Sequence, residues 1–121
     1  MRDFKELTIF KKARLFNKNI YIKSKGFPSD ERFGITSQIR RAATSISANI
    51  SEGCGRNNDK VFAHFLDIAY ASACEVECLL LIALDIEIIE RQELDFFIDN
   101  LDEIKKMAFS FARKLRAEAE T

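Results

Sequence analysis

Helix-breaking residues are scarce in this chain of 121 residues, and their scarcity limits the possible folds more than any other feature of the sequence. There is one proline, Pro28, and there are four glycines, at positions 26, 34, 53 and 55. Long segments can therefore remain helical without interruption. Apolar residues recur every three or four positions, and nothing alternates like a strand for more than a few residues. The sequence predicts an all-α protein.

The apolar periodicity predicts four helices, at residues 6–24, about 29–55, 59–84 and about 90–118. Gly26 and Pro28 end the first helix. The second is expected to start near Ser29, a hydroxyl N-cap followed by two acidic residues that the helix dipole favours. It is expected to stop at Gly53 and Gly55. The run Asn-Asn-Asp at 57–59 offers three N-caps for the third helix.

Four long helices joined by short loops predict an antiparallel up-and-down four-helix bundle, with residues 1–121 forming one domain. No apolar run approaches about 18 residues, and the N-terminus lacks the apolar core of a signal peptide. We therefore expect a cytoplasmic protein without a membrane partner. Cys54, Cys74 and Cys78 are expected to be buried free thiols, because free cysteine is among the most buried residue types.

Charge is distributed unevenly along the chain, although the net charge is zero. Residues 1–56 carry 12 Lys+Arg and 5 Asp+Glu, which gives +7, whereas residues 57–121 carry 7 and 14, which gives −7. This asymmetry suggests polyanion binding or head-to-tail self-association. Attraction between the two halves within one bundle is the alternative.

The second helix is unusually poor in long charged side chains. Its core line is Ile35, Ile39, Ala42, Ala43, Ile46, Ile50 and Gly53. Its flanks and back are mostly Ser, Thr, Ala and Asn, which lower helix propensity but let another helix approach closely. Because one bundle cannot supply a second buried side for this helix, we expect a neighbouring subunit to pack against the back, which holds Ser37, Arg41 and Ala48. A mediocre surface helix is the alternative.

The segment "FPSDERFGITSQIRRAATSISANISEGCGR" (27–56) resembles the signature of the 23S rRNA intervening-sequence protein family, also called the S23 family. The matching residues include Glu31, Gly34, Gln38, Arg40, Arg41, Asn49, Glu52, Gly53, Gly55 and Arg56. A second stretch, "FAHFLDIAYASACEVECLL" (62–80), resembles another segment of that family, with Ala71 where a glycine is usual.

The resemblance implies an up-and-down four-helix bundle that forms homo-oligomers, with a pentameric ring favoured. Some members of the family are encoded inside intervening sequences of bacterial 23S rRNA genes. A similar branch comprises accessory proteins of diversity-generating retroelements, which work with a reverse transcriptase and bind nucleic acid. The resemblance gives Cys54 no role, because that position varies in the family.

Residues typical of enzymes are sparse. His64 is the one histidine, so the paired Glu-x-x-His motifs of a di-iron bundle cannot form. Cys54 has no evident base to activate it. A Cys₃His zinc site would need His64 and all three cysteines, two of which lie near the apolar stripe of the third helix. We therefore predict no enzyme activity, no catalytic residue, no metal and no cofactor.

These features favour a non-enzymatic homo-oligomer that binds structured RNA or DNA through phosphates. The candidate nucleic-acid contacts are Lys11, Lys12, Lys18, Arg40, Arg41, Arg56 and Lys60. The candidate oligomer or structural residues are Ser37, Gln38, Ser45, Ala48, Asn49, Glu52, Ser72, Glu75 and Glu77. The three glutamates among them are expected to pair with Arg40, Arg41 or Arg56. The alternative function is a protein-interaction scaffold, or an accessory subunit of a nucleic-acid enzyme such as a reverse transcriptase.

Overall fold

The computed structural model describes residues 2–121, and this part of the chain contains helices and no strand. The four long helices are α1 (Thr8–Ser24), α2 (Ile35–Gly55), α3 (Asp59–Asp85) and α4 (Arg91–Ala119). Short 3₁₀ turns at Phe4–Glu6 and Ser29–Glu31 precede α1 and α2. The prediction of an all-α chain with four long helices is confirmed.

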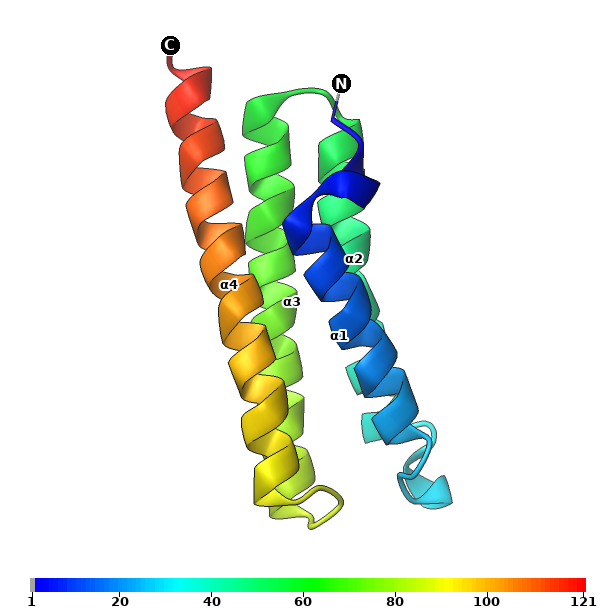
Figure 1. The fold of residues 1–121 in the computed structure, drawn as a ribbon. Helices are drawn as coiled ribbons and strands as arrows, with labels where there is room; N and C mark the ends of the chain where they lie inside the picture. Colours follow the sequence, from blue (N-terminus) through cyan, green and yellow to red (C-terminus); the bar gives the residue numbers. More distant parts are fainter. Residues whose placement is uncertain (1) are drawn as a thin grey trace.

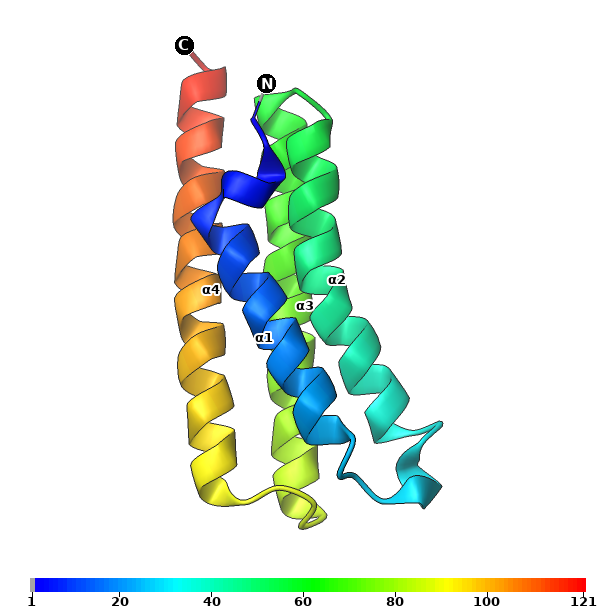
Figure 2. The same ribbon diagram turned by 45° about the vertical axis from the view of Figure 1, so that its right-hand side comes forward.

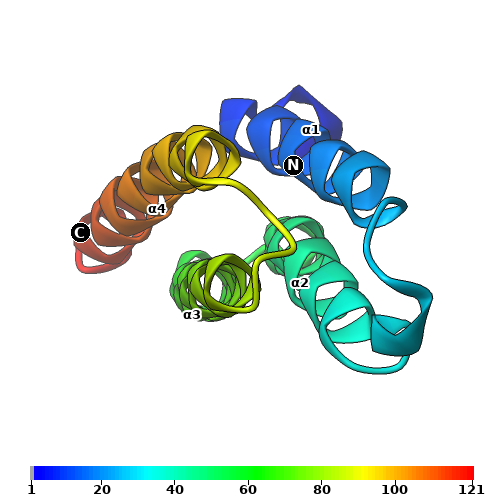
Figure 3. The ribbon, with the colours of Figure 1, turned by 90° about the horizontal axis from the view of Figure 1, so that it is seen from below.

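Successive helices run in opposite directions along the molecule, and both chain ends lie at the same end (Figures 1 and 2). Seen end-on, the helices occupy four corners, with α1 diagonally across from α3 (Figure 3). Each helix contacts its two neighbours around this square, and within residues 2–121 neither diagonal pair is in contact. The outward faces of α1 and α3 therefore point away from each other.

One continuous apolar core fills the space between the helices. It takes residues from every helix at spacings of three and four, as an amphipathic helix requires. Its fully buried centre includes Ile20, Ile39, Ile46, Ile50, Phe62, Leu66, Val76, Leu80, Leu101 and Leu115. None of the helices in the described part is long and apolar enough to cross a membrane.

The predicted start of the second helix at Ser29 is wrong. Residues 29–31 form a single 3₁₀ turn without a side-chain cap, and the backbone leaves helical geometry at Gly34 (φ −102°, ψ −117°) before α2 begins. The Ser-Asp-Glu pattern therefore marks a local turn between two helices rather than a helix start. Phe33, in this connection, is 88% exposed.

The second helix ends at Gly55, as predicted, whereas Gly53 lies within the helix. A Cβ atom at Gly53 would lie 2.5 Å from the Cβ of Phe65 and 2.9 Å from Cδ1 of Phe62. Gly53 therefore allows α2 and α3 to approach closely. The chain reverses after α2 through Asn57, whose φ of 54° is left-handed, and Asn58 caps α3 by accepting a bond from the Val61 N–H at 3.0 Å.

Candidate interaction surfaces

Most of the basic residues predicted to contact nucleic acid have partners within the chain. Lys11 lies 3.7 Å from Glu6, Lys12 lies 2.5 Å from Glu103, and Arg56 lies 2.8 Å from Glu52. By contrast, neither Lys18 nor Lys60 forms an ion pair within residues 2–121. The predicted residues therefore do not form one continuous, unengaged basic surface.

Arg40 ties α2 to the C-terminal end of α1. Its Nε donates to Ser24 Oγ at 2.7 Å, and its Nη2 donates to the Tyr21 carbonyl at 3.4 Å. The guanidinium carbon also lies 4.8 Å from the centre of the Tyr21 ring. The Tyr21 carbonyl also accepts from the Lys25 N–H and the Ser24 hydroxyl, and a cation is favoured at this C-terminal end of a helix. Arg40 is therefore engaged in packing two helices together.

Glutamates on α3 pair with basic residues on both neighbouring helices. Glu75 forms an ion pair with Arg41 of α2. Glu77 does not pair with an arginine, as the sequence had suggested, but with Lys105 of α4, at 2.6 Å. The hydrogen bond to Glu77 raises the pKa of Lys105. These two pairs join α3 to α2 on one flank and to α4 on the other. Between them, the exposed residues of the outer face from Ala71 to Ile82 are uncharged.

The small polar residues of α2 pack mainly against other helices of the same chain. Ser45 Oγ and Ser72 Oγ lie 2.8 Å apart, and the Asn49 side-chain amide donates to the Ser45 carbonyl at 2.8 Å and to its hydroxyl at 2.9 Å. On the other flank, Thr44 donates to Asn17 at 3.3 Å. Neighbouring helices, α3 and α1, thus supply partners for Ser45 and Thr44, one on each flank.

The back of α2 remains open. Ser37, Arg41 and Ala48 are exposed along it, and so are Gln38 and Glu52 on the adjoining flank. Ser51 donates to the Ala48 carbonyl of its own helix. This face carries few apolar atoms. A partner that covered it would therefore bury less apolar surface than a partner on the outward face of α3.

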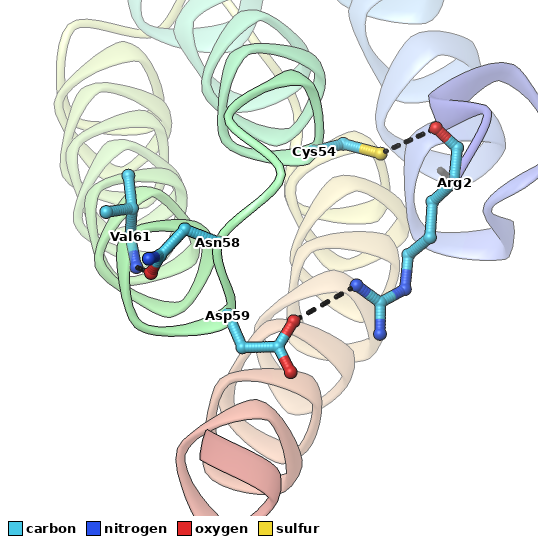
Figure 4. A network of polar contacts seen from close by, with 5 residues as sticks. All are labelled: Arg2, Cys54, Asn58, Asp59 and Val61. Atoms are coloured by element: carbon cyan, nitrogen blue, oxygen red, sulfur yellow. Dashed lines mark hydrogen bonds and ion pairs between the residues drawn. The ribbon is translucent and has the colours of Figure 1, made fainter.

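The N-terminus is fastened to the α2–α3 turn by contacts that sequence reasoning missed (Figure 4). Arg2 Nη1 lies 3.3 Å from Asp59 Oδ1, and the Cys54 thiol donates to the Arg2 carbonyl at 3.5 Å. The Arg2 guanidinium also lies within 6 Å of the rings of Phe62 and Phe111. Arg2 precedes the first periodic segment, so no pattern in the sequence indicated its role.

The three cysteines differ in their environments. Cys54 is buried, and burial raises the pKa of its thiol, which keeps it protonated and unreactive at neutral pH. Cys74 and Cys78 are exposed, so the prediction that all three are buried is wrong for these two. They lie on the face of α3 that points away from the core, one turn apart.

The outward face of α3 carries a row of exposed residues that we call the α3 stripe. It comprises Ala71, Cys74, Cys78, Leu81, Ile82 and Asp85. Leu81 is 45% exposed and Ile82 is 42% exposed. Only the last residue of the stripe is charged. A solvated helix normally carries charged side chains on its outward face, so this composition is typical of a helix with a further packing partner.

The outward face of α1 carries a second row, which we call the α1 stripe. It comprises Lys11, Leu15, Lys18, Ile22 and Lys25, all of them exposed. Leu15 and Ile22 are 58% and 56% exposed, and they lie one heptad apart between the three lysines. This alternation of basic and apolar residues was not recognised in the sequence, because the core stripe dominates the periodicity of that segment.

A shallow apolar groove of about 410 Å³ separates the start of α1 from the C-terminal half of α4. It is lined by Leu7, Thr8, Ile9, Met107, Ser110, Phe111 and Lys114. Within residues 2–121, no group of three or more His, Cys, Asp or Glu side chains is arranged to hold a metal ion. His64 is exposed and lies beside the ring of Phe65.

Comparison with known proteins agrees with the resemblance seen in residues 27–56. A family model described as 23S rRNA-intervening sequence protein matches residues 5–110. A solved structure, of a protein with unknown function from the S23 ribosomal protein family of Bacteroides thetaiotaomicron VPI-5482, has a TM-score of 0.80 and 28% identity. The similarity covers 87% of this chain and 98% of that chain. No curated protein matches the chain. The chain belongs to the 23S rRNA-intervening sequence protein family.

Proposed function

We propose that this protein is a non-enzymatic, self-associating scaffold whose assembled form recruits other macromolecules. The observation that carries the proposal is the α3 stripe, which leaves several turns of helix exposed without a charge before Asp85. Exposed contiguous apolar surface of this kind marks interaction sites on soluble proteins. The arrangement of four helices places this surface on a rigid support.

The absence of an assembled reaction centre in residues 2–121 agrees with a scaffold role. The one histidine contacts an aromatic ring rather than a nucleophile, and the Cys54 thiol donates to a backbone carbonyl. Nucleophilic catalysis needs a base within hydrogen-bonding reach of the nucleophile, and neither group has this arrangement.

Self-association is the first component of the proposal, and light scattering coupled to size exclusion tests it. The chain has a mass of 13.9 kDa, and the pentameric ring implied by the family resemblance would have five times that mass. Native mass spectrometry gives the number of copies independently. A particle of 13.9 kDa at all accessible protein concentrations would contradict the proposal.

A second candidate function is phosphate-mediated binding of RNA or DNA by the oligomer. Lys60 favours it, because this exposed lysine has no ion pair within the described residues and lies in the first turn of α3, four residues after Arg56. The pair Arg56–Glu52 is half exposed, and such pairs are weak enough for a phosphate to compete with them. Lys12 and Arg41, also in exposed pairs, could contribute in the same way.

A salt titration of nucleic-acid binding distinguishes the two candidates. Binding through phosphates weakens steeply with salt, and each lost contact reduces the slope of log K against log salt by about one unit. The double change Arg56→Gln and Lys60→Gln should reduce the slope by about two. Lys106→Gln, at an exposed lysine on α4, is the matched control. If the wild type does not bind at about 50 mM salt, the nucleic-acid function is rejected and the scaffold function is the one that is kept.

A further inference from the structure

We infer that the α1 stripe of one copy packs against the α3 stripe of the next copy, so that the oligomer is built from unlike faces. This inference rests on the proposed self-association and specifies where it occurs. Both stripes are exposed and contain large apolar side chains. Neither has a partner element in its own chain, because the two helices lie at opposite corners (Figure 3).

Charge favours the pairing of unlike stripes. The α1 stripe holds three lysines and no acid, and neither Lys18 nor Lys25 forms an ion pair within residues 2–121. The α3 stripe ends at Asp85, which also lacks an ion pair in that part of the chain, and Asp67 lies one turn before its start. Two α1 stripes would bring lysines together, and two α3 stripes would bring aspartates together. Only the mixed contact places opposite charges side by side.

The spacing of the two stripes also matches. The α1 stripe advances by four, three, four and three residues from Lys11 to Lys25. The α3 stripe advances by three, four, three and four residues through Ala71, Cys74, Cys78, Leu81 and Asp85, with the exposed Ile82 beside this line. Steps of three and four keep one face of a helix turned toward a partner helix over about 20 Å.

The direction of the helices fixes how the stripes would align. Helices α1 and α3 run in the same direction within one copy (Figure 1). Copies related by rotation about an axis along the bundle would therefore pack α1 parallel to α3. The register that pairs charge with charge places Lys25 beside Asp85, Ile22 beside Ile82 and Lys18 beside Cys78.

A contact between two different faces can repeat from copy to copy, because each copy keeps one free stripe of each kind. Such heterologous contacts close into rings or continue as open chains. Lys11 and Lys18 would then be covered by the neighbouring copy, so phosphate binding would fall to the remaining basic residues. The contact between the stripes thus removes Lys11 and Lys18 from the phosphate contacts that the sequence had suggested.

Engineered disulfide formation tests the contact directly. Lys18→Cys places a thiol opposite Cys78 of the next copy, whereas within one chain these positions lie on opposite corners of the bundle. Mild oxidation of the variant should give a ladder of dimers, trimers and larger species on a non-reducing gel. The ladder should disappear when Cys74→Ser and Cys78→Ser are added. Lys106→Cys, on the exposed face of α4, is the matched control and should give no ladder.

Charge exchange provides a second test that does not depend on oxidation. Asp85→Lys and Lys25→Glu should each raise the dissociation constant of the oligomer at least tenfold, because each places like charges together. The double variant should restore the wild-type mass. Ala48→Glu, on the open back of α2, should leave the mass unchanged.

Each alternative gives a different result. A monomeric wild type would contradict self-association as such. An oligomeric wild type that gives no ladder with Lys18→Cys and keeps its mass with Asp85→Lys would overturn only the contact between the two stripes. Dissociation by Ala48→Glu would place the interface on the back of α2. Oxidation of the wild type to dimers alone would indicate that α3 pairs with a second α3.

Discussion

Gly53 shows how one missing Cβ atom determines the distance between two helices. We expect Gly53→Ala to destabilise the fold by about 1–3 kcal/mol, the usual effect of overpacking. The added methyl would lie 2.5 Å from the Cβ of Phe65, an atom that cannot move without its helix. We expect the free-energy cost of this clash to exceed the gain in helix propensity, about 1 kcal/mol, that alanine brings over glycine inside a helix. Urea unfolding monitored by circular dichroism measures the difference.

Gly55 is the matched control for this prediction. It is the last residue of the same helix, and a Cβ there would have no atom within 4 Å other than its local neighbours. Gly55→Ala should therefore be neutral or slightly stabilising, because alanine restricts the unfolded chain. Equal effects of the two substitutions would show that close packing against α3 is not what position 53 requires.

The sequence predicted that the glutamates have basic partners, but it predicted the identity of each partner less well. It correctly indicated that Glu52 and Glu75 have basic neighbours, since the structure places Arg56 and Arg41 beside them. It could not indicate Lys105 as the partner of Glu77, because that pair depends on how α3 and α4 align over 28 positions of sequence separation. It placed Gly53 on the core line, but it could not indicate that Phe62 and Phe65 pack directly on this position.

At the scale of elements, the start of α4 is joined to the end of α1 by one carboxylate. The Glu93 carboxylate accepts a hydrogen bond at 2.8 Å from the backbone N–H of Glu90, the N-cap residue of α4. It also pairs with Lys23 of α1. Its pKa is lowered chiefly by the hydrogen bond from Lys23 and also by the backbone bond at the cap. The charged form is therefore favoured in the folded state.

Because the folded pKa lies below the unfolded one, Glu93 stabilises the fold above its ordinary pKa, and this contribution disappears as pH falls through the lowered value. We expect Glu93→Gln to reduce the free energy of unfolding by about 0.5–1 kcal/mol at pH 7, a range reduced for solvent screening. The glutamine keeps an oxygen for the cap. Below the lowered pKa the free energies of unfolding of the two proteins should converge. Urea unfolding at a series of pH values measures both differences.

Asp95→Asn provides the comparison for Glu93. Asp95 pairs with Arg91, one turn earlier on the same exposed helix face. Its removal should change stability by less than about 0.5 kcal/mol at any pH. If Glu93→Gln behaves like Asp95→Asn, the contact with Lys23 does not join the helices energetically.

Helix bounds were predictable wherever a local cap marks them. The Asn-Asn-Asp run placed the start of α3 within the observed turn, and the end of α1 at Ser24 agrees with the predicted limit. The start of α2 was wrong by six residues, because a serine followed by acids is equally compatible with a 3₁₀ turn. The α1 and α3 stripes were not predicted, because the residues of the larger, core-facing apolar side dominate the periodicity of each helix.

At the scale of the whole molecule, thiol labelling should depend on protein concentration. If the α3 stripe is covered in the oligomer, Cys74 and Cys78 should react slowly with a thiol reagent when the protein is concentrated and rapidly when dilution separates the copies. Cys54 should react slowly in both conditions, because it is buried within its own chain. Mass spectrometry of the labelled peptides separates the three sites. Rapid labelling of Cys74 in the concentrated sample would mean that the stripe is free.

The groove between α1 and α4 has a consequence for the internal motions of the molecule. The groove opens beside Met107 and Phe111, and along this seam the backbones of α1 and α4 approach each other at fewer places than those of α2 and α3. Opening α1 away from α4 therefore exposes less apolar surface than separating α2 from α3, where Gly53 brings the backbones together. We expect amide hydrogens of α1 to exchange as a separate cooperative unit, at a lower opening free energy than those of α3. Assembly through the α1 stripe would slow that exchange. In the oligomer, α1 would therefore gain more protection from the adjacent copy than the other helices.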